Sequence, residues 1–224
     1  MKKLIIFVII FALILGGVFY IFLTNRTGEQ VQGLVCYKGS KFRKSTGIVI
    51  TDELKDKYRS QIKELSQNLV SAENFFNLGM VYRNLDELNK SCEMFLKSIE
   101  LDANAFLTFS ALGTVYQEIQ DYQQAEQAFK KTIELNSEDA NTYVKLAFLY
   151  RANLNKTKEE IIDFYEKSVV TTSGNVNLAR DYASYLEEVK EYQKAIEIWE
   201  ALIERGSGDP EIISKKIEEL KSKL

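Results

Sequence analysis

The sequence predicts an all-α protein, with one N-terminal transmembrane helix followed by a solenoid of helix-turn-helix repeats. Three observations predict this fold class. Residues Leu4–Leu23 contain no charged side chain. From Thr51 onward, apolar residues recur every three or four positions, which is the spacing of an amphipathic helix. Similar residues in that region also return at a fixed offset of 34 positions, which indicates an internal structural repeat.

Composition excludes several classes of protein. The chain has 224 residues, of which 46% are hydrophobic, and it contains one proline, which does not suit a disordered chain. It has no histidine, so Ser-His-Asp triads, Cys-His dyads and histidine metal sites are excluded. A net charge of −3 gives no electrostatic reason to expect nucleic-acid binding. We therefore expect no catalytic, cofactor-binding or metal-binding residue, and no enzyme activity.

The apolar run at residues 4–23 predicts a membrane anchor. A helix of this length spans about 30 Å, the thickness of the hydrocarbon core of a bilayer. A cleaved signal peptide is the alternative, but its apolar core is usually shorter, about 7–15 residues. Lys2 and Lys3 precede the run, which favours a cytoplasmic N-terminus and an extracytoplasmic remainder in a bacterial envelope. A later basic cluster leaves the reverse orientation open; it comprises Lys38, Lys41, Arg43 and Lys44.

Two further features belong to this N-terminal part. Ala12 and Gly16 form a small-xxx-small pair, which would let two anchors pack together as a homo-oligomer. Residues 24–50 show no sustained helical period, so we expect a tether between the anchor and the rest of the chain.

One helix is expected before the repeats, within residues 51–71. Thr51 or Asp52 would cap it. Its apolar face repeats every three or four positions and comprises Leu54, Tyr58, Ile62, Leu65 and Leu69.

The internal repeat is clearest when two segments are aligned. The segment 75-FFNLGMVY-82 matches 109-FSALGTVY-116, and 95-FLKSIEL-101 matches 129-FKKTIEL-135. A third unit starts in the same register, but its second half is displaced by two residues. A fourth unit carries 192-YQKAIEIW-199, which matches 122-YQQAEQAF-129. The two extra residues therefore belong in the turn of the third unit, near 153–158.

This pattern resembles the tetratricopeptide repeat, a helix-turn-helix unit of 34 residues. Aromatic residues fill its first slot at Phe75, Phe109 and Tyr143, and Leu-Gly pairs follow at positions 78–79 and 112–113. The resemblance implies a right-handed solenoid of four repeats, at 72–105, 106–139, 140–175 and 176–209. Capping helices at 51–71 and 210–224 would close its two ends.

Individual residues fit this architecture. Gly79 and Gly113 would let paired helices approach closely, where a side chain would separate them. Asp209 is a plausible N-cap for the closing helix, and Pro210 suits its first position.

The family resemblance implies a concave groove lined by first-helix residues. The peptide-carboxylate clamp known in the family is absent, because Phe76 and Met80 stand where that clamp has lysine and asparagine. Val144 and Phe148 would extend an apolar strip edged by arginines, suited to an amphipathic helix or an extended apolar peptide. The groove residues are Phe76, Met80, Arg83, Asn84, Leu107, Ser110, Thr114, Gln117, Asn141, Val144, Phe148, Arg151 and Arg180. The alternative is that these side chains pack against neighbouring helices, or that helix 52–70 folds back over them.

The sequence thus predicts a membrane-anchored scaffold that binds a protein or peptide, as an assembly or accessory factor of an envelope complex. A general chaperone for unfolded exported proteins is the alternative. Cys36 and Cys92 would be able to pair after export, but Cys92 adjoins an apolar face, which favours a small core residue.

Overall fold

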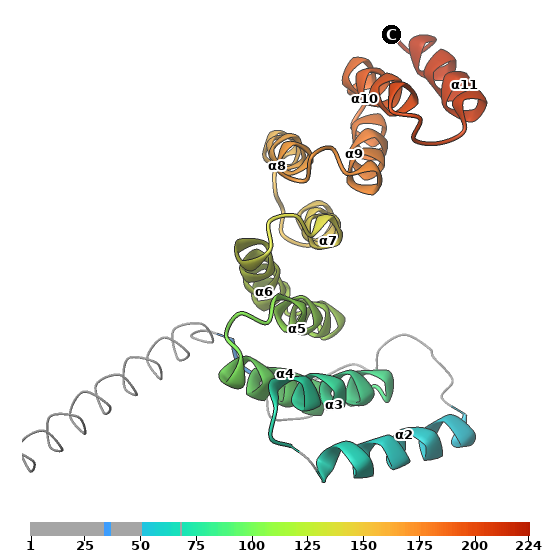
Figure 1. Ribbon diagram of the computed structural model, residues 1–224. Helices are drawn as coiled ribbons and strands as arrows, with labels where there is room; N and C mark the ends of the chain where they lie inside the picture. Colours follow the sequence, from blue (N-terminus) through green and yellow to red (C-terminus); the bar gives the residue numbers. More distant parts are fainter. Residues whose placement is uncertain (1–33, 37–50, 68) are drawn as a thin grey trace, which may run out of the picture. The chain divides into compact units, whose positions relative to one another are not determined.

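The computed structural model describes residues 34–36, 51–67 and 69–224. Within these ranges it contains ten helices and no strand, so the predicted all-α class is confirmed there (Figure 1). The helices are α2 (Asp52–Ser66), α3 (Ala72–Asn84), α4 (Leu88–Leu101), α5 (Phe106–Glu118), α6 (Tyr122–Leu135), α7 (Ala140–Ala152), α8 (Lys158–Thr171), α9 (Val176–Glu188), α10 (Tyr192–Glu204) and α11 (Pro210–Lys221).

The predicted anchor at residues 4–23 lies outside the described residues, as does all of the predicted tether except 34–36. In the part of the chain that the structure describes, no helix has both the length and the apolar character needed to cross a bilayer.

Each of the four predicted repeats contains one helix pair, and the turns inside the first, second and fourth pairs follow one pattern. Asp86, Gln120 and Lys190 each adopt a left-handed backbone, with φ of 61°, 64° and 64°. The amide of the next residue then donates to a carbonyl five positions back, for example from Glu191 to Leu186 at 2.8 Å. This closure satisfies a carbonyl that the helix end would otherwise leave unpaired.

The third pair has a longer turn. Five residues separate α7 from α8, whereas three separate α3 from α4 and α5 from α6, so the two extra residues lie where the repeat alignment placed them. Asn155 takes the left-handed conformation here, with φ of 49°. Thr157 and Glu160 form a capping box that starts α8.

The chain divides into two compact units between Gln124 and Ala125, in the first turn of α6. Unit 1 contains α2 to α5, and unit 2 contains most of α6 and all of α7 to α11. Each unit is described by itself below.

Unit 1 is built around the α3, α4 and α5 side chains. Phe95, Ile99, Phe109 and Leu112 are fully buried. Gly79 confirms the predicted close approach, because a Cβ there would lie 2.6 Å from the Phe95 ring. Helix α2 differs from the others, since none of its residues is fully buried. It packs on α3 but contributes little to the core.

Unit 2 has an aromatic core. The rings of Tyr165 and Tyr182 stack with their centroids 5.0 Å apart. Helix α11 closes the end: Asp209 caps it, Pro210 is its first residue, and its buried side chains are Ile213, Ile217 and Leu220.

Trp199 marks the place where three helices of this unit meet. Its indole N–H, on α10, donates to Glu187 of α9 at 2.8 Å. Lys216 of α11 lies 5.4 Å from the ring centroid and forms an ion pair with the same Glu187 carboxylate at 3.0 Å.

Candidate functional site

The predicted groove residues lie on the first helices of their repeats, as the sequence register requires. Helices α3 and α5 carry eight of them in unit 1, and α7 and α9 carry five in unit 2. Their exposure differs. Leu107 and Phe148 have 59% and 51% of their surface exposed, which is unusual for large apolar side chains, whereas Ser110 is buried at 8%.

Unit 1 contains an apolar recess at the N-terminal ends of α3 and α5. Phe76, Phe106 and Leu107 line this recess, which has a volume of about 330 Å³. Ser98 also lines it, and the Ser98 hydroxyl donates to the Ala72 carbonyl at 2.8 Å. The structure thus brings two predicted groove residues, Phe76 and Leu107, together around one cavity.

The charges around the apolar recess are all of one sign. Glu73 and Asp102 are its charged lining residues, and no lysine or arginine lines it. An apolar side chain with a cation beside it therefore complements this recess better than one with an anion. Sequence reasoning missed Phe106 and Asp102. Phe106 is the first residue of α5 and Asp102 precedes that helix, and neither is one of the groove positions carried over from the family.

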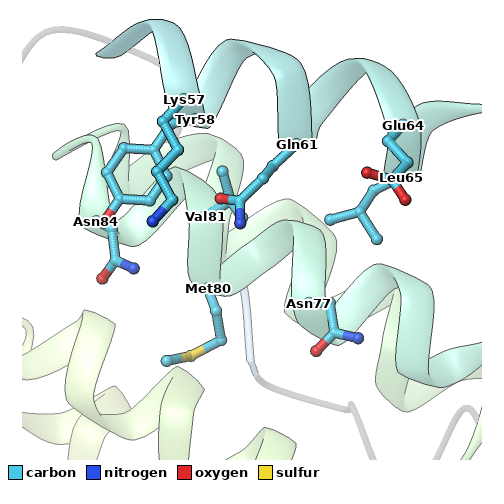
Figure 2. Close-up of a pocket in the computed structure, with 9 residues that line it drawn as sticks. All are labelled: Lys57, Tyr58, Gln61, Glu64, Leu65, Asn77, Met80, Val81 and Asn84. Carbon is cyan, nitrogen blue, oxygen red and sulfur yellow. The ribbon is translucent and has the colours of Figure 1, made fainter. Parts of the chain in front are cut away.

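A second recess of unit 1, the polar recess, lies between α2 and α3 and has a volume of about 540 Å³ (Figure 2). Lys57, Gln61 and Glu64 face it from α2, one helical turn apart, and Asn77 faces it from α3. Met80 and Asn84, both predicted groove residues, also line it. Helix α2 thus lies beside part of the predicted groove, in line with the alternative that the helix at 52–70 covers it.

The arginines predicted to edge the groove have partners inside the chain. Arg83 of α3 donates through Nε to Glu118 of α5 at 3.0 Å, and its Nη2 contacts the same carboxylate. Both side chains are about one quarter exposed. Arg180 donates to the Ser207 carbonyl at 3.0 Å.

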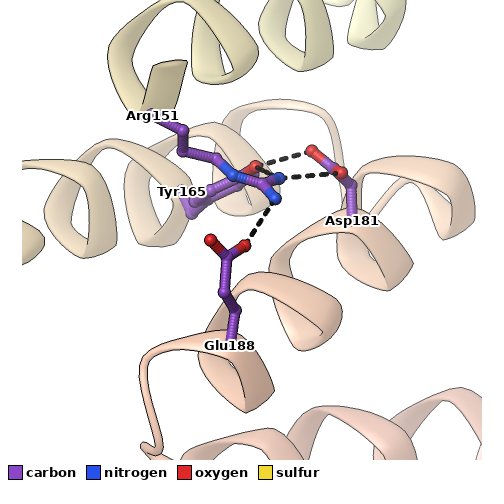
Figure 3. A network of polar contacts seen from close by, with 4 residues as sticks. All are labelled: Arg151, Tyr165, Asp181 and Glu188. Carbon is purple, nitrogen blue, oxygen red and sulfur yellow. Dashed lines mark hydrogen bonds and ion pairs between the residues drawn. The ribbon is translucent and has the colours of Figure 1, made fainter.

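Arg151 is the centre of a larger network in unit 2 (Figure 3). Its Nη2 donates to Glu188 at 2.8 Å, and its Nη1 lies 3.3 Å from both Asp181 and the Tyr165 hydroxyl. That hydroxyl donates to Asp181 at 2.6 Å. Burial raises the pKa of the Tyr165 hydroxyl well above its usual value, and the Asp181 carboxylate raises it further. Tyr165 therefore stays a neutral hydrogen-bond donor further into the alkaline range than an exposed tyrosine does.

The two arginine clusters are equivalent in the repeat. Arg83 and Arg151 occupy the same position of their first helices, and Glu118 and Glu188 occupy the same position of the following first helix. This cation–anion pair joins neighbouring repeats within each unit. The corresponding step between the second and third repeats has Gln117 and Ala152, which cannot form an ion pair.

The interpretation of Cys92 as an unpaired core residue is wrong. Cys92 is buried, with 2% of its surface exposed, but it forms a disulfide with Cys36 of the segment 34–36. The burial was predictable from the apolar face of α4. The pairing was not, because 56 positions separate the two residues and no local pattern places them together.

A family model of the tetratricopeptide repeat matches residues 72–104 and 108–139, which cover the helix pair α3–α4 and all but the first two residues of the pair α5–α6. These two pairs are tetratricopeptide repeats, as their sequence predicted. A search of curated protein sequences finds no match.

Solved structures share the fold of most of the chain. MamA has a TM-score of 0.54 at 21% identity and covers 79% of this chain and all of its own. PilF of Pseudomonas aeruginosa has a TM-score of 0.55 at 18% identity, over 77% of this chain and 80% of its own. YrrB, with 0.51 at 18% identity, covers 66% of this chain and 75% of its own. At these identities, the similarity shows the fold alone.

Proposed function

We propose that this chain is a non-catalytic scaffold that binds a protein or peptide through its first two repeats at a membrane surface. The apolar recess of unit 1 is the observation that carries this proposal. It places Phe76 and Leu107 around a cavity of about 330 Å³, and Leu107 is 59% exposed. YrrB, which shares the fold, is described as a repeat protein with an unusual peptide-binding site, so the architecture is compatible with such a role.

The chemistry of the recess indicates which kind of ligand it would favour. Glu73 and Asp102 at the recess favour a segment with lysine or arginine next to the apolar side chain that enters it. The intrachain partners of Arg83, Arg151 and Arg180 argue against these arginines as the main recognition groups. Apolar contact and neighbouring cations on the ligand therefore replace the arginine-edged strip that the sequence suggested.

Membrane attachment is part of the proposal. Residues 4–23 supply an uncharged run long enough to cross a bilayer. The Cys36–Cys92 disulfide supports an extracytoplasmic location for the repeats, since disulfides persist in oxidising compartments and are rare in the cytosol. A scaffold in that position would serve the assembly of an envelope complex.

The test uses the full-length chain in detergent micelles and fluorescent peptides. One peptide has a central phenylalanine between two arginines, and its partner has glutamates in place of the arginines. We expect the basic peptide to bind and Leu107→Ser to weaken it at least fivefold. Leu101→Ser is the matched control, because Leu101 is 55% exposed but does not line the apolar recess. Equal binding of both peptides, or an equal loss in the control, would contradict the proposal.

If the chain is instead a general chaperone, the outcome should differ. It would suppress aggregation of several unrelated unfolded proteins, and the Leu107→Ser effect would not depend on basic residues in the client. If binding requires the arginines of the peptide, the scaffold function is favoured over the general chaperone.

A further inference from the structure

The segment Leu34–Cys36 is attached to unit 1 by three different interactions at three successive residues. The Leu34 side chain is buried, with 7% of its surface exposed. The Val35 carbonyl accepts a hydrogen bond from the Tyr116 hydroxyl of α5 at 3.2 Å. Cys36 is bonded to Cys92 of α4. The segment is thus fixed to both the first and the second repeat.

The disulfide changes how much chain separates the repeats from residue 23. With the bond formed, Leu34 is the first residue that the structure places against the repeats, and ten residues lie between it and residue 23. Without the bond, the next described attachment is helix α2, which begins at Asp52. Among the described contacts, one hydrogen bond and one buried side chain then hold the segment 34–36. At about 3.5 Å per residue, the fully extended reach is at most about 40 Å in the first case and about 100 Å in the second.

We propose that Cys36–Cys92 is a site of thiol–disulfide exchange that sets how far the repeats extend from the membrane. This inference rests on the membrane attachment proposed above. In the oxidised chain, unit 1 is confined to the region next to the bilayer. In the reduced chain, it reaches ligands more than twice as far away.

Burial decides which sulfur reacts. Cys92 is 2% exposed, so an external thiolate attacks the Sγ of Cys36, which is more accessible. A mixed disulfide forms on Cys36, and Cys92 leaves as a thiolate that takes up a proton. A second thiol of the same dithiol reductant then releases Cys36 and becomes a disulfide. Two electrons and two protons pass in total from the dithiol to the protein.

The experiment reconstitutes the full-length chain in phosphatidylcholine vesicles that contain a small fraction of lipid with a photoreactive headgroup. Crosslinked peptides are identified by mass spectrometry before and after treatment with dithiothreitol. We expect crosslinks to α4 and α5 to fall at least threefold on reduction. Cys36→Ser should give the low value in both conditions, and it leaves the buried Cys92 side chain in place.

Val35→Ala is the matched control, because it alters a half-exposed side chain of the same segment and keeps both cysteines and the backbone carbonyl. It should behave as the unaltered chain does. Circular dichroism of each sample checks that the helices remain. If crosslinking is unchanged by reduction while the chain resists extraction with alkaline carbonate, the exchange proposal is wrong. If carbonate removes the chain from the vesicles, the membrane attachment itself is wrong.

Discussion

Residues at the same position of different repeats can make the same contact. Arg83 and Arg151 each reach a carboxylate on the next first helix. Neither pairing was apparent from helical periodicity, which describes one helix at a time. The signal was nevertheless present, because an arginine recurs at one repeat position and an acid recurs one repeat and one residue later. Reading the sequence by repeat position finds such contacts where reading by local pattern does not.

Replacing Arg151 should destabilise unit 2. Arg151→Met would leave Asp181 and Glu188 without their cation, and the partly buried site makes this costly. We expect a loss of about 2 kcal/mol in the free energy of unfolding, measured by urea denaturation. Lys167→Met is the control, since its pair with Asp163 is exposed and should contribute less than about 0.5 kcal/mol. Equal losses in the two variants would show that the network has no special role.

Substitution of a left-handed turn residue by glycine should instead stabilise unit 2. Lys190 is exposed and has φ of 64°, a conformation that costs a non-glycine residue about 1 kcal/mol or more. Lys190→Gly should therefore raise the free energy of unfolding by about 0.5–1 kcal/mol. Glu197→Gly, at an exposed position inside α10, should lower it by about 1 kcal/mol. Thermal denaturation of the two variants measures both changes. If Lys190→Gly does not stabilise the chain, the turn argument is wrong.

At the scale of elements, hydrophobic periodicity and the fixed offset were sufficient to predict the helices. The helix pairs α3–α4 and α5–α6 were predictable because their apolar slots match residue for residue. The position of α2 beside the predicted groove was expected only as an alternative, because an amphipathic face does not indicate which surface it packs against. The disulfide was considered but not favoured for a related reason: it depends on where residues 34–36 lie against α4.

Helices α2 and α5 should differ in stability. Helix α2 has no buried residue, whereas α5 has seven. Leu112→Ala, at a fully buried position of α5, should cost about 3 kcal/mol. Leu65→Ala, at a half-buried position of α2, should cost about 1 kcal/mol or less. Hydrogen exchange of the unaltered chain should also be fastest in α2, and equal protection of the two helices would contradict this ranking.

At the scale of the whole molecule, the part of the chain that the structure describes divides into two compact units. The division lies in α6, close to the repeat step that has Gln117 and Ala152 in place of an arginine and an acid. The two units also differ chemically, since unit 1 contains the disulfide and unit 2 the cluster of buried tyrosines.

Unit 2 should lose stability in alkali. Burial raises the pKa of Tyr150, Tyr165 and Tyr182 above the usual value near 10. Their contribution to stability is fully present below pH 10, and it is lost as the pH rises further, because only the unfolded chain then ionises readily. Urea midpoints should fall between pH 9 and pH 11. Lysine ion pairs also weaken there, so a smaller fall in Tyr165→Phe identifies the tyrosine part.

Reduction should affect unit 1. A disulfide that joins residues 56 positions apart restricts the unfolded chain by about 4 kcal/mol in the loop-entropy model. Hydrogen exchange in α3, α4 and α5 should accelerate on reduction, while α9 and α10 keep their protection. Equal acceleration in both units would show that they do not unfold separately.

Trp199 allows the unfolding of unit 2 to be followed separately from that of unit 1. It is the one tryptophan of the chain, and it is held between Glu187 and Lys216 where α9, α10 and α11 meet. Its fluorescence is therefore an intrinsic optical probe of the C-terminal end, without any added label. The cysteine pair reports on unit 1 through its reactivity with alkylating reagents. The protein thus carries a separate spectroscopic or chemical signal for each half, and the order in which the halves open can be followed in a single sample.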